Sequence, residues 1–366
     1  MRKLKKEIKM EKRTIILTGG GTGGHVVPNI SLLPYLKKHF DKIFYIGTNG
    51  IEKEMMSGKV NKFFEIKAFK LRRDKKLANL LLPFRLLGSI RECKKILKKT
   101  RPSVIFSKGG YVSVPVCIAS KMLKIPIVSH ESDLSLGLAN KVICRLSNTL
   151  CTTFEKTAQN IKKGVFTGSP IRKELFEGQK EKGYQITSFD GKRKIILFTG
   201  GSTGAKGIND CVFASIELLT NKYDIIHLVG KGKGQKINNP HYCQMEFCSQ
   251  IEHLFAIADI VVTRAGSNAI YELLAISKPM LLIPLPKGSS RGDQVENAKY
   301  FEQKGYARIL YQENLNSKTL LDNIDDMIAN QTAIQNKLQQ IPKRALINGA
   351  ENITKEILKS QKNAQK

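Results

Sequence analysis

The sequence predicts an α/β fold in which two parallel-sheet domains face a cleft. Strand-like and helix-like segments alternate along the chain, and this alternation is typical of parallel sheets with helices on both faces. A glycine-rich turn follows an apolar run twice, as TGGGTGGH at residues 18–25 and as TGGSTGAK at residues 199–206. The length of 366 residues suits two domains, since a typical domain has about 150. The chain is therefore predicted to consist of two similar α/β halves.

A polar stretch between residues 164 and 194 marks the join between these halves. We expect a first domain over residues 1–167 and a second over residues 168–345, with a last helix at residues 346–366 that packs back on the first domain. Ligands of open parallel sheets bind at the carboxyl ends of the strands, and both glycine turns lie at such ends. Two substrates are therefore expected to meet between the domains.

Short apolar and β-branched runs mark the expected strands. They lie at residues 14–17, 42–46, 103–106, 125–129, 194–198, 225–229, 260–263 and 280–283. The helix expected after the first glycine turn carries three leucines at helical spacing, namely Leu32, Leu33 and Leu36. A later helix aligns an apolar stripe that should face the core, formed by Leu86, Ile90, Cys93 and Leu97.

The first glycine turn exposes backbone N–H groups at the start of a helix, where partial positive charge gathers. Such a turn suits a phosphate or a developing anion. A dinucleotide site is the alternative, because Gly19, Gly21 and Gly24 satisfy G-x-G-x-x-G. The acidic residue that would bind a ribose is missing after the second strand, where residues 47–50 read GTNG. A phosphate-binding P-loop does not fit either, since no Gly-Lys-Ser/Thr closes the run.

His25 follows the glycine turn directly. The pKa of an unperturbed histidine is about 6.5, so its neutral form can accept a proton at neutral pH. The alternative is a histidine that only packs at a helix start. Behind an anion-binding turn we favour the first interpretation, and His25 is the candidate general base.

The second half offers further candidates beside its own glycine turn. Ser202 presents a hydroxyl to a phosphate or caps a helix, and Arg172 follows a Gly-Ser-Pro turn where its guanidinium could grip a diphosphate or simply face solvent. Glu272 lies about one turn inside a helix and could accept both hydroxyls of a ribose, or could only favour the helix start. Asp293 and Gln294 could bind sugar hydroxyls, with helix capping by Asp293 as the alternative.

Charge and cysteine content limit the class of protein. Lys and Arg number 61 against 31 Asp and Glu, giving a formal charge of +30 that attracts polyanions. No nucleic-acid-binding motif accompanies this charge and tryptophan is absent, so we expect no nucleic acid partner. Seven cysteines without C-x-x-C spacing indicate a reducing compartment. No apolar run approaches the roughly 20 residues that span a bilayer, and we expect a soluble, cytoplasmic protein.

We expect no metal site. His130 and Glu131 begin a H-E-x-x-H pattern, but Leu134 stands where the second histidine should be. A second group has suggestive residue types and comprises His241, Cys243, Cys248 and His253. Cys243 belongs to an alternating apolar strand, however, and this favours burial over metal binding.

Residues 70–87 combine basic and apolar side chains ahead of a helix. Four side chains could form a membrane-contacting knob, namely Leu80, Leu81, Leu82 and Phe84. Basic residues surround them and would each add about 1 kcal/mol near anionic lipid. These are Arg72, Arg73, Lys75, Lys76 and Arg85. Burial of the leucines in the domain is the alternative.

Seven motifs occur in one characteristic order. They are GGGTGGHVVP, SKGGYVSVP (residues 107–115), HESDLSLGLANK (130–141), GSPIR, GGSTGAK, RAGSNAIYE (264–272) and RGDQVENA (291–298). Together they closely resemble the MurG family, the N-acetylglucosaminyltransferases of peptidoglycan synthesis. The resemblance runs from about Thr14 to the last helix.

The resemblance implies a GT-B fold with two Rossmann-like domains. It implies transfer of N-acetylglucosamine from UDP-N-acetylglucosamine to the 4-hydroxyl of undecaprenyl-diphosphate-linked N-acetylmuramoyl pentapeptide, with inversion and with His25 as the base. Donor-binding residues by this analogy are Arg172 and Ser202 (diphosphate), Cys248 (uracil), Glu272 (ribose), Gln294 (sugar), and Gly21, Thr22, Gly23, Ser267 and Asn268. Acceptor-binding residues are Gly24, Tyr111, Asp133 and Asn140.

The chain departs from the family pattern at three positions. Many members have Asn at Asp133, Gln at Asp293 and Gly at Val114, which leaves the roles of the two aspartates open. No D-x-D triad is present to hold a cation, so we expect turnover without a cofactor or metal. The expected location is the cytoplasmic face of the cell membrane, at an anionic surface. The alternatives are a related transferase that glycosylates diacylglycerol and a non-catalytic binder of anionic membranes.

Overall fold

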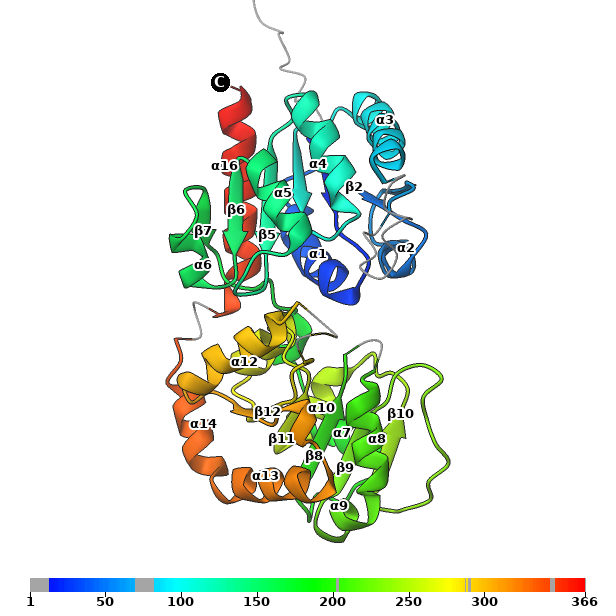
Figure 1. Ribbon diagram of the computed structural model, residues 1–366, viewed down its shortest axis with the longest axis vertical. Helices are drawn as coiled ribbons and strands as arrows, with labels where there is room; N and C mark the ends of the chain where they lie inside the picture. Colours follow the sequence, from blue (N-terminus) through cyan, green and yellow to red (C-terminus); the bar gives the residue numbers. More distant parts are fainter. Residues whose placement is uncertain are drawn as a thin grey trace, which may run out of the picture.

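The structure is a computed structural model that describes residues 13–69, 82–201, 204–286, 288, 291–342 and 346–365. Its two α/β domains lie one above the other (Figure 1). The first domain holds a seven-stranded sheet and the second a six-stranded sheet, and every strand pair in both sheets is parallel. The predicted fold class is confirmed.

The first sheet has the strand order β3-β2-β1-β4-β5-β6-β7. Its strands are β1 Thr14–Thr18, β2 Lys42–Gly47, β3 Lys62–Glu65, β4 Val104–Ser107, β5 Ile127–Glu131, β6 Thr149–Thr152 and β7 Gly164–Phe166. The order reverses between β1 and β4. This is the switch point where open α/β sheets bind ligands, and the first glycine turn begins there.

Helices cover both faces of the first sheet. They are α1 Gly23–Leu36, α2 Ile51–Met56, α3 Leu82–Thr100, α4 Ser113–Met122, α5 Leu138–Leu146, α6 Glu155–Gln159 and, from the end of the chain, α16 Gly349–Gln365. Figure 1 shows α16, in red, inside the first domain. Ile353 and Ile357 of α16 are buried with Leu32 and Leu36 of α1 in one core on one face of the sheet. The helix α3 helps to form the core on the other face.

The second sheet repeats this arrangement with the order β10-β9-β8-β11-β12-β13. Its strands are β8 Ile195–Thr199, β9 Asp224–Leu228, β10 Tyr242–Met245, β11 Ile260–Thr263, β12 Met280–Leu282 and β13 Arg308–Ile309. Its α-helices are α7 Lys180–Thr187, α8 Lys206–Ala214, α9 Ile216–Lys222, α10 Ile251–Ile257, α11 Ser267–Ala275, α12 Asp293–Gln303, α13 Ser317–Ala329 and α14 Gln331–Gln339. The second glycine turn follows β8, at the corresponding switch point.

The predicted strands agree with the observed ones to within two residues, and the stripe of α3 is confirmed because Ile90, Cys93 and Leu97 are buried. The strands that the sequence did not reveal lie mainly toward the edges of the sheets. β7 has three residues and β13 has two. Strands this short are too brief to show an alternation of apolar and polar residues. They form because the neighbouring strands and the surrounding packing favour them.

Gly110 and Gly88 differ in whether the backbone can accept a larger residue, so the same substitution at both forms a matched pair. Gly110 has a φ of +82°, and a Cβ there would lie 2.5 Å from the carbonyl oxygen of Gly20 in the first glycine turn. Gly88 lies inside α3, and a Cβ added there would meet no heavy atom within 4 Å beyond the backbone of its own helix. We expect Gly110→Ala to destabilise the protein by ~1–3 kcal/mol and Gly88→Ala to stabilise it by ~0.5–1 kcal/mol. Thermal unfolding checks both, and equal midpoints for the two variants would contradict the expectation.

Candidate active site

The turns that follow the central strands of the two sheets meet at the domain interface. The side-chain amide of Asn268, at the start of α11, donates from Nδ2 to the carbonyl oxygen of Gly24 at 3.0 Å. Its Oδ1 accepts from Ser132 Oγ at 3.0 Å, and Ser267 Oγ donates to the carbonyl oxygen of Ser132. The turn after β11 therefore contacts both the first glycine turn and the loop after β5.

His25 lies at this interface as the third residue of α1. Thr22 Oγ1 lies 3.0 Å from its Nδ1, which orients the ring. The side chain is half-buried, and the charges that act on it are those of Lys108, Asp133, Arg291 and Glu52. Removal from water, reinforced by Lys108, lowers the pKa of His25 to about 4. The imidazole is therefore neutral at neutral pH and can accept a proton.

The depressed pKa of His25 predicts the acid side of the pH–rate profile. A group with a lowered pKa stays neutral as the pH falls, until the pH approaches its own pKa. We expect kcat/KM to remain level between about pH 7 and pH 5 and to fall on the acid side only toward the pKa of about 4. The measurement is kcat/KM between pH 4 and 8, and an acid limb near the unperturbed value of about 6.5 would contradict it.

The buried carboxylate of Glu52 is hydrogen-bonded to the first glycine turn. Glu52 is 1% exposed and accepts hydrogen bonds from the backbone N–H of Gly21 at 3.3 Å and of Thr48 at 3.0 Å. Tyr45 donates its hydroxyl to the carbonyl oxygen of Gly19 at 2.5 Å. Glu52 is not among the residues predicted from the sequence. Its spacing from Met56, four residues later on the buried face of α2, is the signal that was available.

The predicted acceptor residues lie around the same turn. Tyr111 covers Gly21, whose added Cβ would lie 2.6 Å from the Tyr111 ring. Asn140 is buried and donates from Nδ2 to Glu131 Oε2 at 3.0 Å. This bond holds the segment that runs from β5 to the interface. The structure thus brings Gly24, Tyr111 and the end of β5, to which Asn140 is hydrogen-bonded, together at one end of the first sheet.

Asp133 and Asp293, two of the three departures from the family pattern, share one partner. Arg291 Nη2 lies 2.7 Å from Asp133 Oδ2, and Arg291 Nε lies 3.4 Å from Asp293 Oδ1. Asp133 also accepts from Asn297 Nδ2 of α12 at 3.0 Å. Asp293 does not cap α12, because the N-cap is Gly292 with a φ of +91°. The two aspartates therefore hold an arginine between the domains.

Arg172 and Glu272 form an ion pair within the second domain. Arg172 Nε lies 3.1 Å from Glu272 Oε1, and Nη2 lies 3.4 Å from Oε2. This pair fixes the plane of the guanidinium and leaves the donors of Nη1 and one hydrogen of Nη2 for an anion such as a diphosphate. The structure brings these two predicted residues together.

The other predicted donor residues are more scattered. Gln294 accepts from the backbone N–H of Leu285 at 3.0 Å, and Cys248 is half-buried after β10. Ser202 lies outside the described residues. Ser267 and Asn268 direct their side chains to the first domain. Their assignment to the donor stays a prediction, as does that of Gly21, Thr22 and Gly23.

The described residues contain no group of three or more His, Cys, Asp or Glu that could hold a metal ion. His241 Nδ1 lies 2.8 Å from Asp224 Oδ1, and His253 Nδ1 accepts from the backbone N–H of Gln179 at 3.0 Å. His130 is fully buried, with its Nε2 at 3.2 Å from the carbonyl oxygen of Gly168. Each of these histidines has a structural partner.

The predicted membrane knob is only partly described. Leu80, Leu81 and the basic residues from Arg72 to Lys76 lie outside the described residues, and Leu82 begins α3. Phe84 is 73% exposed and Leu87 50% exposed. The Arg85 guanidinium lies 5.1 Å from the ring centroid of Phe69. No helix in the described ranges is sufficiently long and apolar to cross a bilayer.

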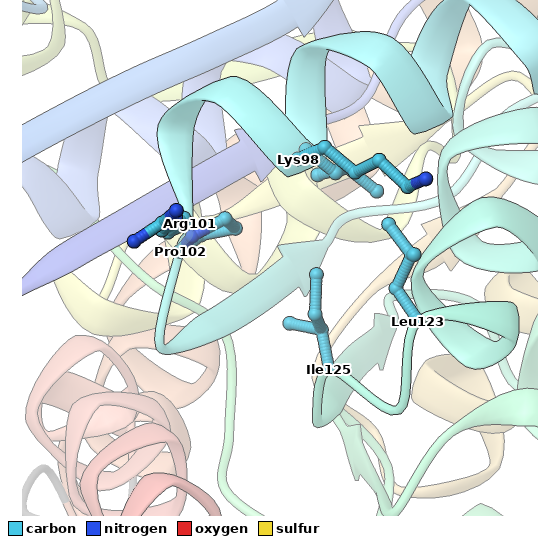
Figure 2. A pocket seen from close by; sticks show the side chains of 6 residues that line it. Lys98, Arg101, Pro102, Leu123 and Ile125 are labelled. Atoms are coloured by element: carbon cyan, nitrogen blue, oxygen red, sulfur yellow. The ribbon is translucent and has the colours of Figure 1, made fainter.

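A separate pocket of about 490 Å³ lies at the opposite end of the first sheet (Figure 2). Figure 2 shows its walls, which include Lys98 of α3, Arg101 just after that helix, and Leu123 and Ile125 from the loop before β5. These residues precede β4 and β5, whereas His25 follows β1. The pocket therefore belongs to the amino ends of the strands and not to the domain interface.

Comparison with known proteins assigns both halves. Residues 15–151 match the glycosyltransferase family 28 N-terminal domain, and residues 195–357 match the glycosyltransferase family 28 C-terminal domain. A curated protein of Clostridium tetani is 45% identical over 348 residues, covering 93% of this chain and 96% of its own length. A Clostridium novyi protein is 46% identical over 325 residues, covering 87% of this chain and 91% of its own length. Both are named UDP-N-acetylglucosamine–N-acetylmuramyl-(pentapeptide) pyrophosphoryl-undecaprenol N-acetylglucosamine transferase.

Solved structures support the fold. The crystal structure of Acinetobacter baumannii MurG has a TM-score of 0.73 at 22% identity, covering 95% of this chain and 99% of its own. The calicheamicin glycosyltransferase CalG4 has a TM-score of 0.73 at 12% identity, covering 98% of this chain and 100% of its own. Both halves of the chain match the domains of one family, and the chain is 45% and 46% identical to the two clostridial relatives. It therefore belongs to glycosyltransferase family 28 and, within it, to the MurG family.

Proposed function

We propose that this glycosyltransferase moves N-acetylglucosamine from UDP-N-acetylglucosamine to the 4-hydroxyl of undecaprenyl-diphosphate-linked N-acetylmuramoyl pentapeptide. The observation that carries the proposal is the contact between Asn268 and Gly24, which sets the start of α11 against the turn of His25. A donor held by the second domain would then present its sugar to a base of the first domain. The names of the relatives supply the substrates.

The proposed reaction needs a base for the attacking hydroxyl and stabilisation of the leaving diphosphate. His25, neutral at neutral pH, takes the proton of the acceptor 4-hydroxyl as its oxygen attacks the anomeric carbon. The bond to the diphosphate breaks on the opposite face, so the configuration inverts and UDP leaves. Arg172 and the glycine turns stabilise the charge on UDP, which is why we expect turnover to continue in EDTA.

A labelled-donor assay tests this function. The protein is incubated with UDP-N-acetyl[¹⁴C]glucosamine, in EDTA, with either the lipid-linked muramoyl pentapeptide or diacylglycerol as acceptor. We expect label only in the muramoyl lipid. Label in diacylglycerol would support the related lipid glycosyltransferase instead, and label in neither would support a non-catalytic membrane binder.

We further propose that residues 1–167 bind the acceptor and the membrane, while residues 168–345 bind the donor. The first domain would then lie on the cytoplasmic face of the cell membrane. Phe84 and Leu87 are exposed apolar side chains on α3, and the same helix carries basic residues over its whole length. Apolar insertion beside positive charge is the usual basis of peripheral binding.

The membrane contact predicts a loss of vesicle binding. We expect the triple change Leu81→Ser, Leu82→Ser and Phe84→Ser to weaken binding to anionic vesicles by roughly tenfold or more, since each buried apolar side chain contributes about 1.5–3 kcal/mol. Leu218→Ser is the matched control, because Leu218 is 48% exposed in the second domain. Co-sedimentation measures binding. Unchanged binding of the triple variant would contradict the membrane knob.

A further inference from the structure

A lysine of the first domain is buried beside His25. Lys108 follows β4 and is 2% exposed. Its Nζ donates to Ser132 Oγ, and no carboxylate of the described residues lies within 4.0 Å of it. A buried cation is costly unless it is paired or hydrogen-bonded, so the bond from Lys108 to Ser132 offsets part of that cost. The hydroxyl that it binds leads directly to the domain interface.

Four groups form one hydrogen-bonded relay across that interface. Lys108 Nζ donates to Ser132 Oγ, and Ser132 Oγ donates to Asn268 Oδ1 at 3.0 Å. Asn268 Nδ2 then donates to the carbonyl oxygen of Gly24 at 3.0 Å. The relay starts in the first domain, crosses to α11 of the second and returns to the residue before His25.

The charge at the start of the relay and the carbonyl at its end together determine the direction of every bond in it. An ammonium group has donors only, so Ser132 Oγ must accept from Lys108 and its single hydrogen is left for Asn268. A carbonyl has acceptors only, so the amide nitrogen of Asn268 must face Gly24. The two ends agree, and the amide of Asn268 has one satisfied orientation. The relay is buried at Lys108 and Ser132, and with both of its ends fixed in this way it holds its members in one arrangement.

We propose that Lys108 is a positioning residue, whose ammonium orders Ser132 and Asn268 and so holds the His25 turn against the start of α11. This inference rests on the proposed function and adds to it a group that sets the alignment of the two domains. Two neighbouring bonds act in the same sense. Ser267 Oγ donates to the carbonyl oxygen of Ser132, and the backbone N–H of Leu134 donates to Asn297 Oδ1 at 3.1 Å.

Loss of the Lys108 charge should loosen the relay. A neutral amine has a lone pair that can accept the hydrogen of Ser132, which releases Asn268. Burial lowers the pKa of Lys108 to about 8, against the opposing effect of Glu131 and Asp133. The other titratable groups that interact with Lys108 are His25 and His130, whose pKa values burial and the lysine both lower. Deprotonation of Lys108 therefore falls near pH 8, where the basic limb of kcat/KM is expected.

The test compares Lys108→Met, Ser132→Ala, the double variant and Lys108→Arg in the full chain. We expect each single variant to lower kcat/KM for UDP-N-acetylglucosamine by about 10–100-fold, because misplacement of a base by ~1 Å has effects of this size. The double variant should be no worse than either single one, since both break the same relay. Lys108→Arg keeps the charge and should retain more activity than Lys108→Met. The basic limb near pH 8 should disappear in Lys108→Met.

A readout without turnover separates this inference from the proposed function. Amide hydrogen exchange in substrate-free protein should be faster in residues 22–26 and 267–272 of Lys108→Met and Ser132→Ala than in the wild type. Additive losses in the double variant, an unchanged basic limb or unchanged exchange in these segments would overturn the positioning role. Failure of the wild type to transfer label would instead overturn the proposed function. If Lys108→Met does not fold, Ser132→Ala and Lys108→Arg decide the question.

Discussion

Replacing His25 with alanine should lower kcat by about 10²–10⁴-fold, the range that a general base contributes. Affinity for UDP-N-acetylglucosamine should stay within about twofold, because His25 acts on the acceptor hydroxyl and not on the donor. Its ring is already neutral at neutral pH, since burial and Lys108 lower its pKa to about 4. The measurements are single-turnover transfer rates and calorimetric titration with the donor.

The control for this variant is His39→Ala. His39 is an exposed histidine just beyond the end of α1, far along the helix from the glycine turn. Its replacement should leave both kcat and donor affinity unchanged. A His25→Ala enzyme with wild-type kcat would remove His25 as the base, and a variant that only loses donor affinity would move it to the donor site.

Arg172→Met should lower kcat/KM for the donor by about 10²-fold. Glu272 holds the Arg172 guanidinium through Nε at 3.1 Å and Nη2 at 3.4 Å, which leaves the donors of Nη1 and the second hydrogen of Nη2 for a diphosphate. Loss of one fixed donor to a developing anion typically reduces turnover by 10²–10³-fold, about the effect expected here. The variant also leaves the Glu272 carboxylate without its cation, and this unpaired negative charge would repel the diphosphate. Steady-state kinetics with varied donor measure the loss.

Two further variants sharpen this test. Arg172→Lys keeps the charge but not the fork, and should recover only part of the activity. Arg308→Met removes a partly exposed arginine that pairs with Asp326 elsewhere in the second domain, and should have wild-type kinetics. If Arg172→Met and Arg308→Met behave alike, Arg172 does not stabilise the leaving group.

The fold was predictable because its signals are local. Apolar runs such as Ile195–Thr199 and the repeated glycine turns are properties of short windows, and helical spacing predicted the burial of Ile90 and Cys93. The short edge strands β7 and β13 were not predictable, since they exist only through pairing with their neighbours. Local patterns thus determine the fold class, and packing determines where the sheets end.

The candidate site was predictable only in part. Arg172 and Glu272 lie 100 residues apart, and their local motifs predicted a separate role for each, yet the two side chains are partners. Asp133 meets Arg291 across the interface from 158 residues away, a pairing that no spacing reveals. Glu52 and Lys108 were not identified, because charged residues within apolar patterns look like exposed ones until the tertiary structure buries them.

The central claim is that the donor sugar meets His25 at the interface between the first glycine turn and α11. A crystal structure with UDP-N-acetylglucosamine and a soluble acceptor analogue tests it most directly. We expect the UDP moiety beside Arg172 and Glu272, with the acceptor 4-hydroxyl at hydrogen-bond distance, about 2.6–3.2 Å, from the His25 ring. A donor bound at the pocket of Leu97 and Arg101, or a His25 ring turned away from the acceptor, would contradict the claim.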